Sequence, residues 1–221
     1  MPGRAAPADR DRPPSQPIKV CLLSDGIPGH VNQAHGLLDW LRADGFSVEV
    51  TLVQCRLRAK WLRPLLAAAC NRLATQDSYS TRHSDHQPTL ARAVLRCYRF
   101  TPEPVAADLI LSAGGNTSFA SAALAHLHQT PNIFIGSPRK LSANTLSALL
   151  TLEPSAGFGH NNVVVDIAPA RVNPEPPHPG TWALLLGGEG SGYTYQRKDW
   201  ESILHWAGDQ ARIHGIRWIV A

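Results

Sequence analysis

The sequence lacks the signatures of several common protein classes. Its longest uninterrupted apolar run, residues 65–70, is far shorter than the ~20 residues that a membrane-spanning helix needs. The motifs GxGxxG, GxxxxGK[ST], HExxH and GxSxG are absent, so the chain shows no dinucleotide fingerprint, Walker loop, zincin helix or nucleophile elbow. The cysteines have no Cys-x-x-Cys spacing, which argues against a zinc ribbon or a disulfide framework and fits a reducing compartment. They are Cys21, Cys55, Cys70 and Cys97.

Charge is also modest. The formal net charge is +4, which does not by itself indicate nucleic acid but is compatible with an acidic surface or a phosphate as partner. Residues 1–17 carry charge and proline without an apolar segment, so we expect a disordered tail rather than a secretory signal. A cytoplasmic protein is therefore the expectation.

Apolar runs and helical spacing alternate along residues 18–167, which predicts parallel β-α-β units and hence an α/β, Rossmann-like domain. The expected strands are residues 18–24, 46–53, 108–112, 132–135, 148–152 and 162–167. The expected helices are residues 31–45, 58–74 with a break or kink at Pro64, 89–99 and 118–128.

Proline then marks a boundary. Five of the residues between 166 and 180 are proline, which predicts a stiff connector that we assign to residues 168–180. The pattern restarts over residues 181–221 with a strand, a glycine loop that contains Gly187 and Gly188, a helix over 197–214 and a strand. One such unit cannot cover both faces of a parallel sheet. We therefore expect the beginning of a second Rossmann-like domain, or a unit that docks onto the first domain or another chain.

The loop after the first expected strand reads Asp25-Gly-Ile-Pro-Gly-His30. Its glycines, Gly26 and Gly29, let backbone N–H groups approach a ligand, and the following helix start favours an anion. His30 is a candidate general base or phosphate ligand. The alternative is that His30 merely caps the helix.

Two further loops follow expected strands. Gly114, Gly115, Asn116 and Thr117 could contact a ligand, or they could form a tight turn in which a side chain caps the helix. The segment Ser137-Pro-Arg139-Lys140 adds adjacent cations suited to a phosphate or carboxylate, with a solvated basic turn as the alternative.

All three loops follow strands of one parallel sheet, so they are expected at the same edge of that sheet. This convergence predicts a single crevice for a phosphate-bearing ligand. His83 and His86 could hold a metal, but no partner ligands are evident around them, so no metal or other cofactor is expected.

A basic segment spans residues 54–72 and contains no acidic residue. Its apolar and cationic side chains could lie on a membrane surface. The alternative is an ordinary packed helix with its arginines in water. The candidate membrane contacts are Arg56, Arg58, Lys60, Trp61 and Arg63.

Four segments resemble the mitochondrial-fission protein family of the elongated-mitochondria type. They are residues 25–33 (Asp-Gly-Ile-Pro-Gly-His-Val-Asn-Gln), 111–118 (Leu-Ser-Ala-Gly-Gly-Asn-Thr-Ser), 136–140 (Gly-Ser-Pro-Arg-Lys) and 183–188 (Ala-Leu-Leu-Leu-Gly-Gly). The first loop is also similar to the Gly-Gly-His loop of the lipid-linked peptidoglycan glycosyltransferase, from which Asp25 and Pro28 depart.

The resemblance implies a two-domain GT-B glycosyltransferase architecture, with the acceptor in the N-terminal domain and a nucleotide-sugar donor in the C-terminal one. Plant members of the family are implicated in mitochondrial division as adaptors, and family members are longer than this chain. Two functions therefore follow as expectations. One is a nucleotide-sugar-dependent transferase with a membrane-proximal or lipid-linked acceptor, peripheral at the inner face of a membrane. The other is a non-catalytic, membrane-associated scaffold.

Overall fold

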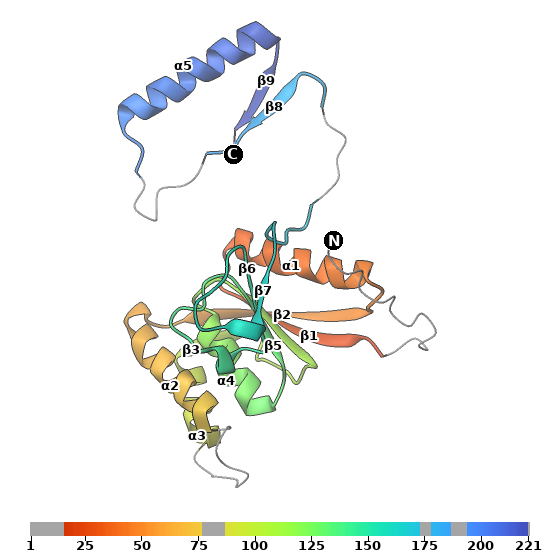
Figure 1. The fold of residues 1–221 in the computed structure, drawn as a ribbon, viewed down its shortest axis with the longest axis vertical. Coiled ribbons are helices and arrows are strands. Elements are labelled where there is room, and N and C mark those ends of the chain that lie inside the picture. Colours follow the sequence, from red (N-terminus) through yellow and green to blue (C-terminus); the bar gives the residue numbers. More distant parts are fainter. Residues whose placement is uncertain (1–15, 77–86, 173–177, 187–193, 221) are drawn as a thin grey trace. The chain divides into compact units, whose positions relative to one another are not determined.

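The computed structural model describes residues 16–76, 87–172, 178–186 and 194–220 (Figure 1). The chain divides into two compact units, Met1–Val172 and Asn173–Ala221. We call them unit 1 and unit 2 and describe each by itself. The residues expected as a disordered tail lie outside the described part of the chain, except for Gln16 and Pro17.

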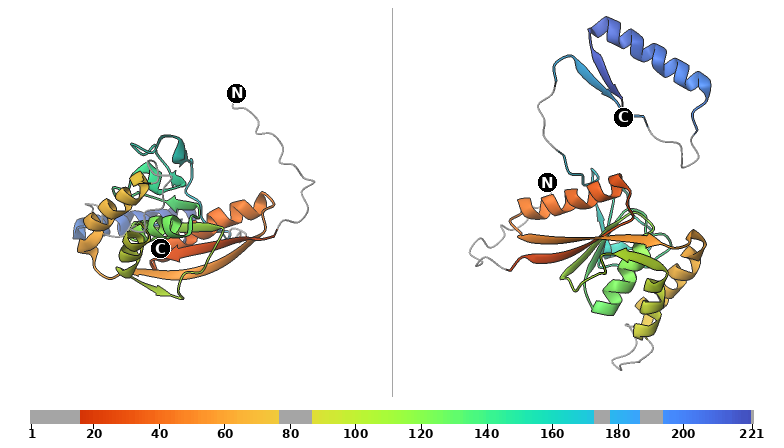
Figure 2. Two further views of the ribbon diagram at one scale, coloured as in Figure 1. Left: turned by 90° about the horizontal axis from the view of Figure 1, so that it is seen from below. Right: turned by 180° about the vertical axis from the view of Figure 1, so that it is seen from behind.

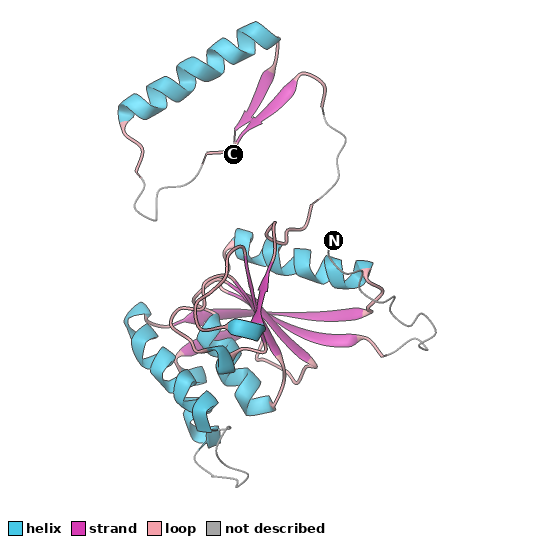
Figure 3. Ribbon diagram, viewed as in Figure 1, coloured by secondary structure: helices cyan, strands magenta, loops and turns pink. Residues whose placement is uncertain are grey.

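Unit 1 is an α/β fold of Rossmann-like type, built on one mostly parallel sheet (Figure 3). The strand order is β3-β2-β1-β4-β5-β6-β7, and only the β2–β3 pair is antiparallel. The strands are β1 (Ile18–Ser24), β2 (Val48–Leu57), β3 (Tyr98–Thr101), β4 (Leu109–Ala113), β5 (Asn132–Ile135), β6 (Ala148–Thr151) and β7 (Asn162–Val164).

Helices cover both faces of this sheet. On one face lies α1 (Pro28–Ala43), where Ala34 and Leu38 pack on Val20, Leu22 and other buried residues of β1, β4 and β5. On the other face lie α2 (Arg63–Gln76), α3 (Gln87–Arg96) and α4 (Ser118–His128), as two views agree (Figure 2). Single helical turns occur at η1 (Lys60–Leu62), η2 (Ala143–Thr145) and η3 (Gly159–Asn161). Burial on both faces explains why β1 is a nearly continuous apolar run.

The strand order reverses direction at β1. The chain moves outward from β1 to β2 on one side and returns to place β4 on the other side. Since α1 and α4 leave this point toward opposite faces, the carboxyl ends of β1 and β4 flank a topological switch point, where open α/β sheets bind ligands.

The structure corrects the predicted elements between residues 54 and 101. The second strand continues to Leu57. The break expected at Pro64 is present, because η1 ends at Leu62 and α2 begins at Arg63 with Pro64 in its first turn. Proline is well suited to that position because its missing N–H has no partner there in any case. Residues 98–101 form the edge strand β3, because Tyr98 and Phe100 alternate inward while Arg99 faces solvent.

The beginning of the expected linker belongs to unit 1. Residues 168–172, which we call the strap, lie against α1. A Cβ on Gly36 would overlap the backbone of Ala170, and the Arg171 N–H donates to the Asn32 carbonyl oxygen over 3.3 Å. The Arg171 guanidinium also pairs with Asp39 over 2.7 and 2.8 Å. The unit boundary follows Val172, inside the range assigned to the linker.

Unit 2 is a single β-α-β unit. Parallel strands β8 (Thr181–Leu184) and β9 (Arg217–Val220) are joined through α5 (Arg197–His214). Gln196 and Asp199 form a reciprocal capping box at the start of α5, and Gly215 ends it with a left-handed φ of 62°. Gly187 and Gly188 lie outside the described residues. Among the described helices of both units, none has the length and apolar character to cross a membrane.

Candidate functional site

The predicted site residues of unit 1 gather at the carboxyl edge of the sheet. The loops after β1, β4 and β5 emerge side by side because these strands are parallel neighbours. They carry Asp25 to His30, Gly114 to Thr117, and Ser137 with Arg139. We use the name rim crevice for this group of loop residues at the edge of the sheet.

A histidine–carboxylate pair forms one side of the rim crevice. The His30 Nδ1 lies 3.0 and 3.1 Å from the two carboxylate oxygens of Asp25. The Asp25 side chain is 6% exposed and that of His30 is 32% exposed. Because Nδ1 is engaged by the carboxylate, Nε2 is the ring nitrogen left for a substrate, which is the arrangement of an oriented general base.

The turn after β1 fixes the carboxylate of this pair. Asp25 Oδ1 also accepts the Ile27 N–H over 3.2 Å, and the Ser24 hydroxyl accepts the Gly26 N–H over 3.0 Å. Gly26 has a φ of +85°, which favours glycine, whereas Gly29 lies exposed in the first turn of α1. The tight turn therefore holds Asp25 beneath His30 before any ligand binds.

Two adjacent glycines connect the loops. A Cβ on Gly114 would lie well under 3.0 Å from the His30 ring, and a Cβ on Gly115 would lie as close to the Arg139 side chain. Both side chains therefore lie directly over the backbone of the β4–α4 turn. The structure places Gly114 and Gly115 with His30 and Arg139, as the convergence of the three loops predicts.

Asn116 and Thr117 have different surroundings. The Asn116 side-chain oxygen accepts a forked pair of hydrogen bonds from Arg63, over 3.1 Å from Nε and 2.7 Å from Nη2. The Asn116 carbonyl oxygen accepts from the Tyr98 hydroxyl over 2.8 Å. Thr117 is fully buried and its hydroxyl lies 2.9 Å from the Gly114 carbonyl oxygen, so Thr117 holds the turn and does not face a ligand.

The loop that carries Ser137 and Arg139 has an unusual backbone. Arg139 and Lys140 take left-handed φ values of 53° and 67°, which side chains other than glycine adopt rarely. Asn71 of α2 holds this turn: its amide donates to the Lys140 carbonyl oxygen over 3.0 Å and accepts the Ser142 N–H over 2.8 Å. Consecutive strained residues are characteristic of ligand sites. Ser137 itself is exposed.

Several contributors escape sequence reasoning. Arg63, a candidate membrane contact, reaches the β4–α4 turn, and Asn71 and Tyr98 support the site from α2 and β3. The Ser112 hydroxyl and the Gln54 side-chain oxygen are buried at the carboxyl ends of β4 and β2 without a partner among the described residues. Ser112 belongs to the segment 111–118 quoted above, whereas Gln54 belongs to no motif, so its position at a strand end was the available signal.

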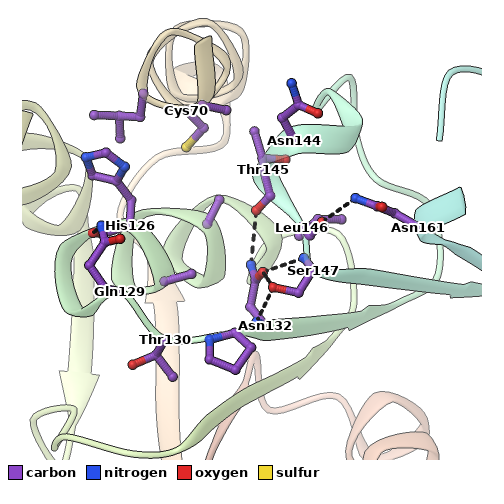
Figure 4. Close-up of a pocket in the computed structure, with 15 residues that line it drawn as sticks. Cys70, His126, Gln129, Thr130, Asn132, Asn144, Thr145, Leu146, Ser147 and Asn161 are labelled. Carbon is purple, nitrogen blue, oxygen red and sulfur yellow. Dashed lines mark hydrogen bonds between the residues drawn. The ribbon is translucent and has the colours of Figure 1, made fainter. Parts of the chain in front are cut away.

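A separate cavity lies at the opposite end of β5, between α4, α2 and η2 (Figure 4). It has a volume of about 440 Å³, and its lining mixes polar side chains such as Asn144 with apolar ones such as Leu73. The buried Asn132 at its floor is fully engaged: its amide donates to Thr145 over 3.1 Å and its oxygen accepts the Ser147 N–H over 2.9 Å. We call this cavity the Asn132 pocket. Its floor residue serves the fold and is not available to a ligand.

The predicted basic segment is not one amphipathic helix. Arg56 lies on β2, and the Arg58 Nε donates to the carbonyl oxygens of Arg96 and Tyr98 over 3.1 and 3.2 Å. Lys60 and Trp61 lie in the single turn η1, both exposed. The segment changes from strand to helix within a few residues, so its side chains serve different parts of the molecule.

No cluster of metal-ligating side chains occurs within the described ranges, and His83 and His86 lie outside them. No protein family model, no curated protein and no solved structure matches this chain. The resemblance to the mitochondrial-fission family thus remains a prediction that rests on the four segments quoted above.

Proposed function

We propose that the rim crevice binds a phosphate-bearing ligand and that the chain belongs to a GT-B-like, nucleotide-sugar-dependent glycosyltransferase. The observation that carries this proposal is the His30–Asp25 pair, which lies against Gly114 while Arg139 lies against Gly115. A general base and a cation thereby face one short stretch of backbone at the switch point of the sheet.

Each group has a role in such a transfer. His30 Nε2 removes the proton from an acceptor hydroxyl, and Asp25 holds the ring and stabilises the imidazolium that forms. The acceptor oxygen bonds to the anomeric carbon of the sugar while the bond from that carbon to the diphosphate oxygen breaks. Arg139 stabilises the negative charge that develops on the diphosphate, and Arg63, held on Asn116, adds positive charge nearby.

A small apolar cavity continues the same edge of the sheet. It has a volume of about 140 Å³ and lies beside α1, where its lining includes Gln33, Ile135, Leu150 and Val165. Gln33 follows His30 by one helical turn. This cavity suits a short apolar part of an acceptor whose hydroxyl lies at His30.

Calorimetric titration of the full chain with uridine diphosphate, guanosine diphosphate and the corresponding nucleotide sugars tests the proposal. We expect binding by at least one of them, weakened by Arg139→Gln and unaffected by the control Arg72→Gln, an exposed arginine of α2. If no nucleotide binds, or if Arg72→Gln weakens binding as much as Arg139→Gln, the proposed site is wrong.

A non-catalytic scaffold is the second candidate, and the apolar surface of unit 2 favours it. Large apolar side chains of α5, β9 and the residues after β8 are exposed, which is typical of protein-binding surfaces. They are Leu185, Leu204, Trp206, Ile213, Ile219 and Val220. Under this function, Leu204→Ser with Ile213→Ser abolishes partner capture, whereas His30→Ala leaves capture unchanged.

A further inference from the structure

Arginines gather along the antiparallel edge of the sheet, in a groove whose described lining does not include His30 or Arg139. An open groove of about 620 Å³ runs along β3 and α3, and it is lined by Arg58, Arg92, Arg96 and Arg99. Glu103 is the single acidic residue of that described lining. We call this the arginine groove.

The register of β2 and β3 brings two positive charges together. Arg56 of β2 lies directly opposite Arg99 of the edge strand β3. Like charges in directly opposite positions of an antiparallel pair are destabilising. Within the described part of the chain, no ion pair involves Arg56, Arg92, Arg96 or Arg99. A bound polyanion would remove this repulsion.

The groove is also partly preorganised. The Arg58 Nε is held by the carbonyl oxygens of Arg96 and Tyr98, so its guanidinium is fixed at the point where β2 ends beside β3. A planar guanidinium held through one nitrogen keeps its other N–H groups free for phosphate oxygens, which it binds in a forked geometry.

Exposed apolar side chains follow at the same end of β2. Trp61 comes three residues after Arg58 and is 73% exposed, and Leu65 of the next turn is 63% exposed. An exposed tryptophan and leucine that follow Arg58 closely in the sequence are elements of an interfacial membrane contact. Nucleic acid fits less well, because the aromatic rings of the groove, Tyr98 and Phe100, are buried and half-buried and offer no open face for base stacking.

We propose that the arginine groove binds the phosphates of anionic lipid headgroups, with Trp61 and Leu65 entering the headgroup boundary of the bilayer. This membrane contact differs from a contact made by residues 54–72 alone, since Arg92, Arg96 and Arg99 come from α3 and β3. It goes beyond the proposed transferase activity and does not depend on His30 or Arg139.

Co-sedimentation of the full chain with vesicles tests the proposal. Vesicles of phosphatidylcholine with phosphatidylserine are compared with pure phosphatidylcholine, at low and at high salt. We expect binding to the anionic vesicles at low salt, about 30-fold weaker for the double variant Arg96→Gln/Arg99→Gln, given roughly five-fold for each cation near an anionic surface. Adding Trp61→Ala to the double variant is expected to weaken binding to the anionic vesicles further.

Arg72→Gln is the matched control, because Arg72 is exposed on α2, lies within residues 54–72 and does not line the groove. It is expected to leave binding unchanged, as is His30→Ala, so failure of the transferase and failure of this proposal are distinguishable. The melting temperature of the double variant is expected to equal or exceed that of the wild type at low salt, because a like-charge pair is relieved.

Three results would overturn the membrane contact. One is binding to anionic vesicles that the double variant retains in full. Another is an equal loss in Arg72→Gln, which would indicate nonspecific attraction to the whole basic surface. The third is binding of soluble inositol hexakisphosphate, or of a single-stranded oligonucleotide, through the same arginines without any binding to vesicles.

Discussion

The rim crevice and the Asn132 pocket lie at opposite ends of the same parallel strands, yet they differ in what their polar groups do. In the Asn132 pocket the floor residue is satisfied by Thr145 and Ser147, although the space above it is large. In the rim crevice His30 is held through Nδ1, and its Nε2 has no partner among the described residues. A ligand site is therefore better indicated by a polar group that is held in place and still has an atom free to bind. The volume of a cavity alone is not sufficient.

Removing His30 is expected to produce the largest effect at the crevice. His30→Ala should lower transfer activity by about 10² to 10⁴-fold, the usual contribution of a general base. Asp25→Asn should lower activity less, because the ring remains while its orientation weakens. Nucleotide binding by both variants should stay close to that of the wild type in calorimetry. His160→Ala, an exposed histidine of η3, serves as the control.

Asn132→Ala is expected to produce the opposite result, a loss of stability without a loss of function. The substitution leaves the buried Thr145 carbonyl oxygen without its donor, which costs about 1 to 3 kcal/mol for an unsatisfied group, whereas the Ser147 N–H keeps the Asn132 backbone carbonyl oxygen as an acceptor. Urea unfolding should report the loss, while nucleotide affinity is unchanged. An equal loss of affinity in a folded variant would contradict the contrast between the two cavities.

Gly114→Ala should combine both effects. The backbone there has a φ of +88°, and the new methyl group would overlap the His30 ring. We expect a destabilisation of about 1 to 3 kcal/mol from overpacking and strain, together with weaker ligand binding. A histidine resonance that keeps its wild-type chemical shift in the variant would show that His30 does not lie on Gly114.

Thiol reactivity sharpens the comparison further. Cys70 lines the Asn132 pocket, but burial raises its pKa to about 12, and burial likewise raises the pKa of Cys21 to about 11 and that of Cys55 above the usual range. Only a thiolate reacts readily. At pH 8 we therefore expect the half-buried Cys97 to react first with a disulfide reagent, and Cys97→Ser to remove the fast phase. Rapid reaction of Cys70 would show that the pocket opens to solvent.

The smallest expected effect concerns the strap. The hydrogen bond from Arg171 holds the pKa of Asp39 at about 2, below its usual value of 3.8. A lowered pKa means that the stabilisation is present above pH 3.8 and is lost as the pH falls toward 2. Both side chains are more than a third exposed, so the contribution should be under about 1 kcal/mol. Asp39→Asn should flatten this part of the curve of stability against pH.

The sequence predicted the parallel core because apolar runs and helical spacing are unambiguous there. The helices over 118–128 and 197–214 and the strand over 132–135 agree with α4, α5 and β5. It missed β3, since a short edge strand directly after a helix resembles its last turn. The break expected at Pro64 is present as the change from η1 to α2, because proline can begin a helix as well as bend one.

The candidate site was predictable in outline but not in its contacts. Parallel strands require the three loops to share an edge, and this much follows from the order of the elements. The pairing of His30 with Asp25 depends on the turn geometry, and Arg63 reaches Asn116 across 53 residues of chain. Such contacts depend on how the helices pack on the sheet, which residue spacing does not specify.

The two adjacent glycines of the β4–α4 turn should tolerate change in different ways. Gly115 has no left-handed φ and is restricted only by the Arg139 side chain above it, whereas Gly114 is restricted by both its φ and the His30 ring. Shortening the Arg139 side chain should therefore make alanine acceptable at position 115. Shortening the His30 side chain should not make it acceptable at position 114. Across related sequences, residue 115 is expected to vary together with residue 139, while residue 114 stays glycine whatever stands at position 30.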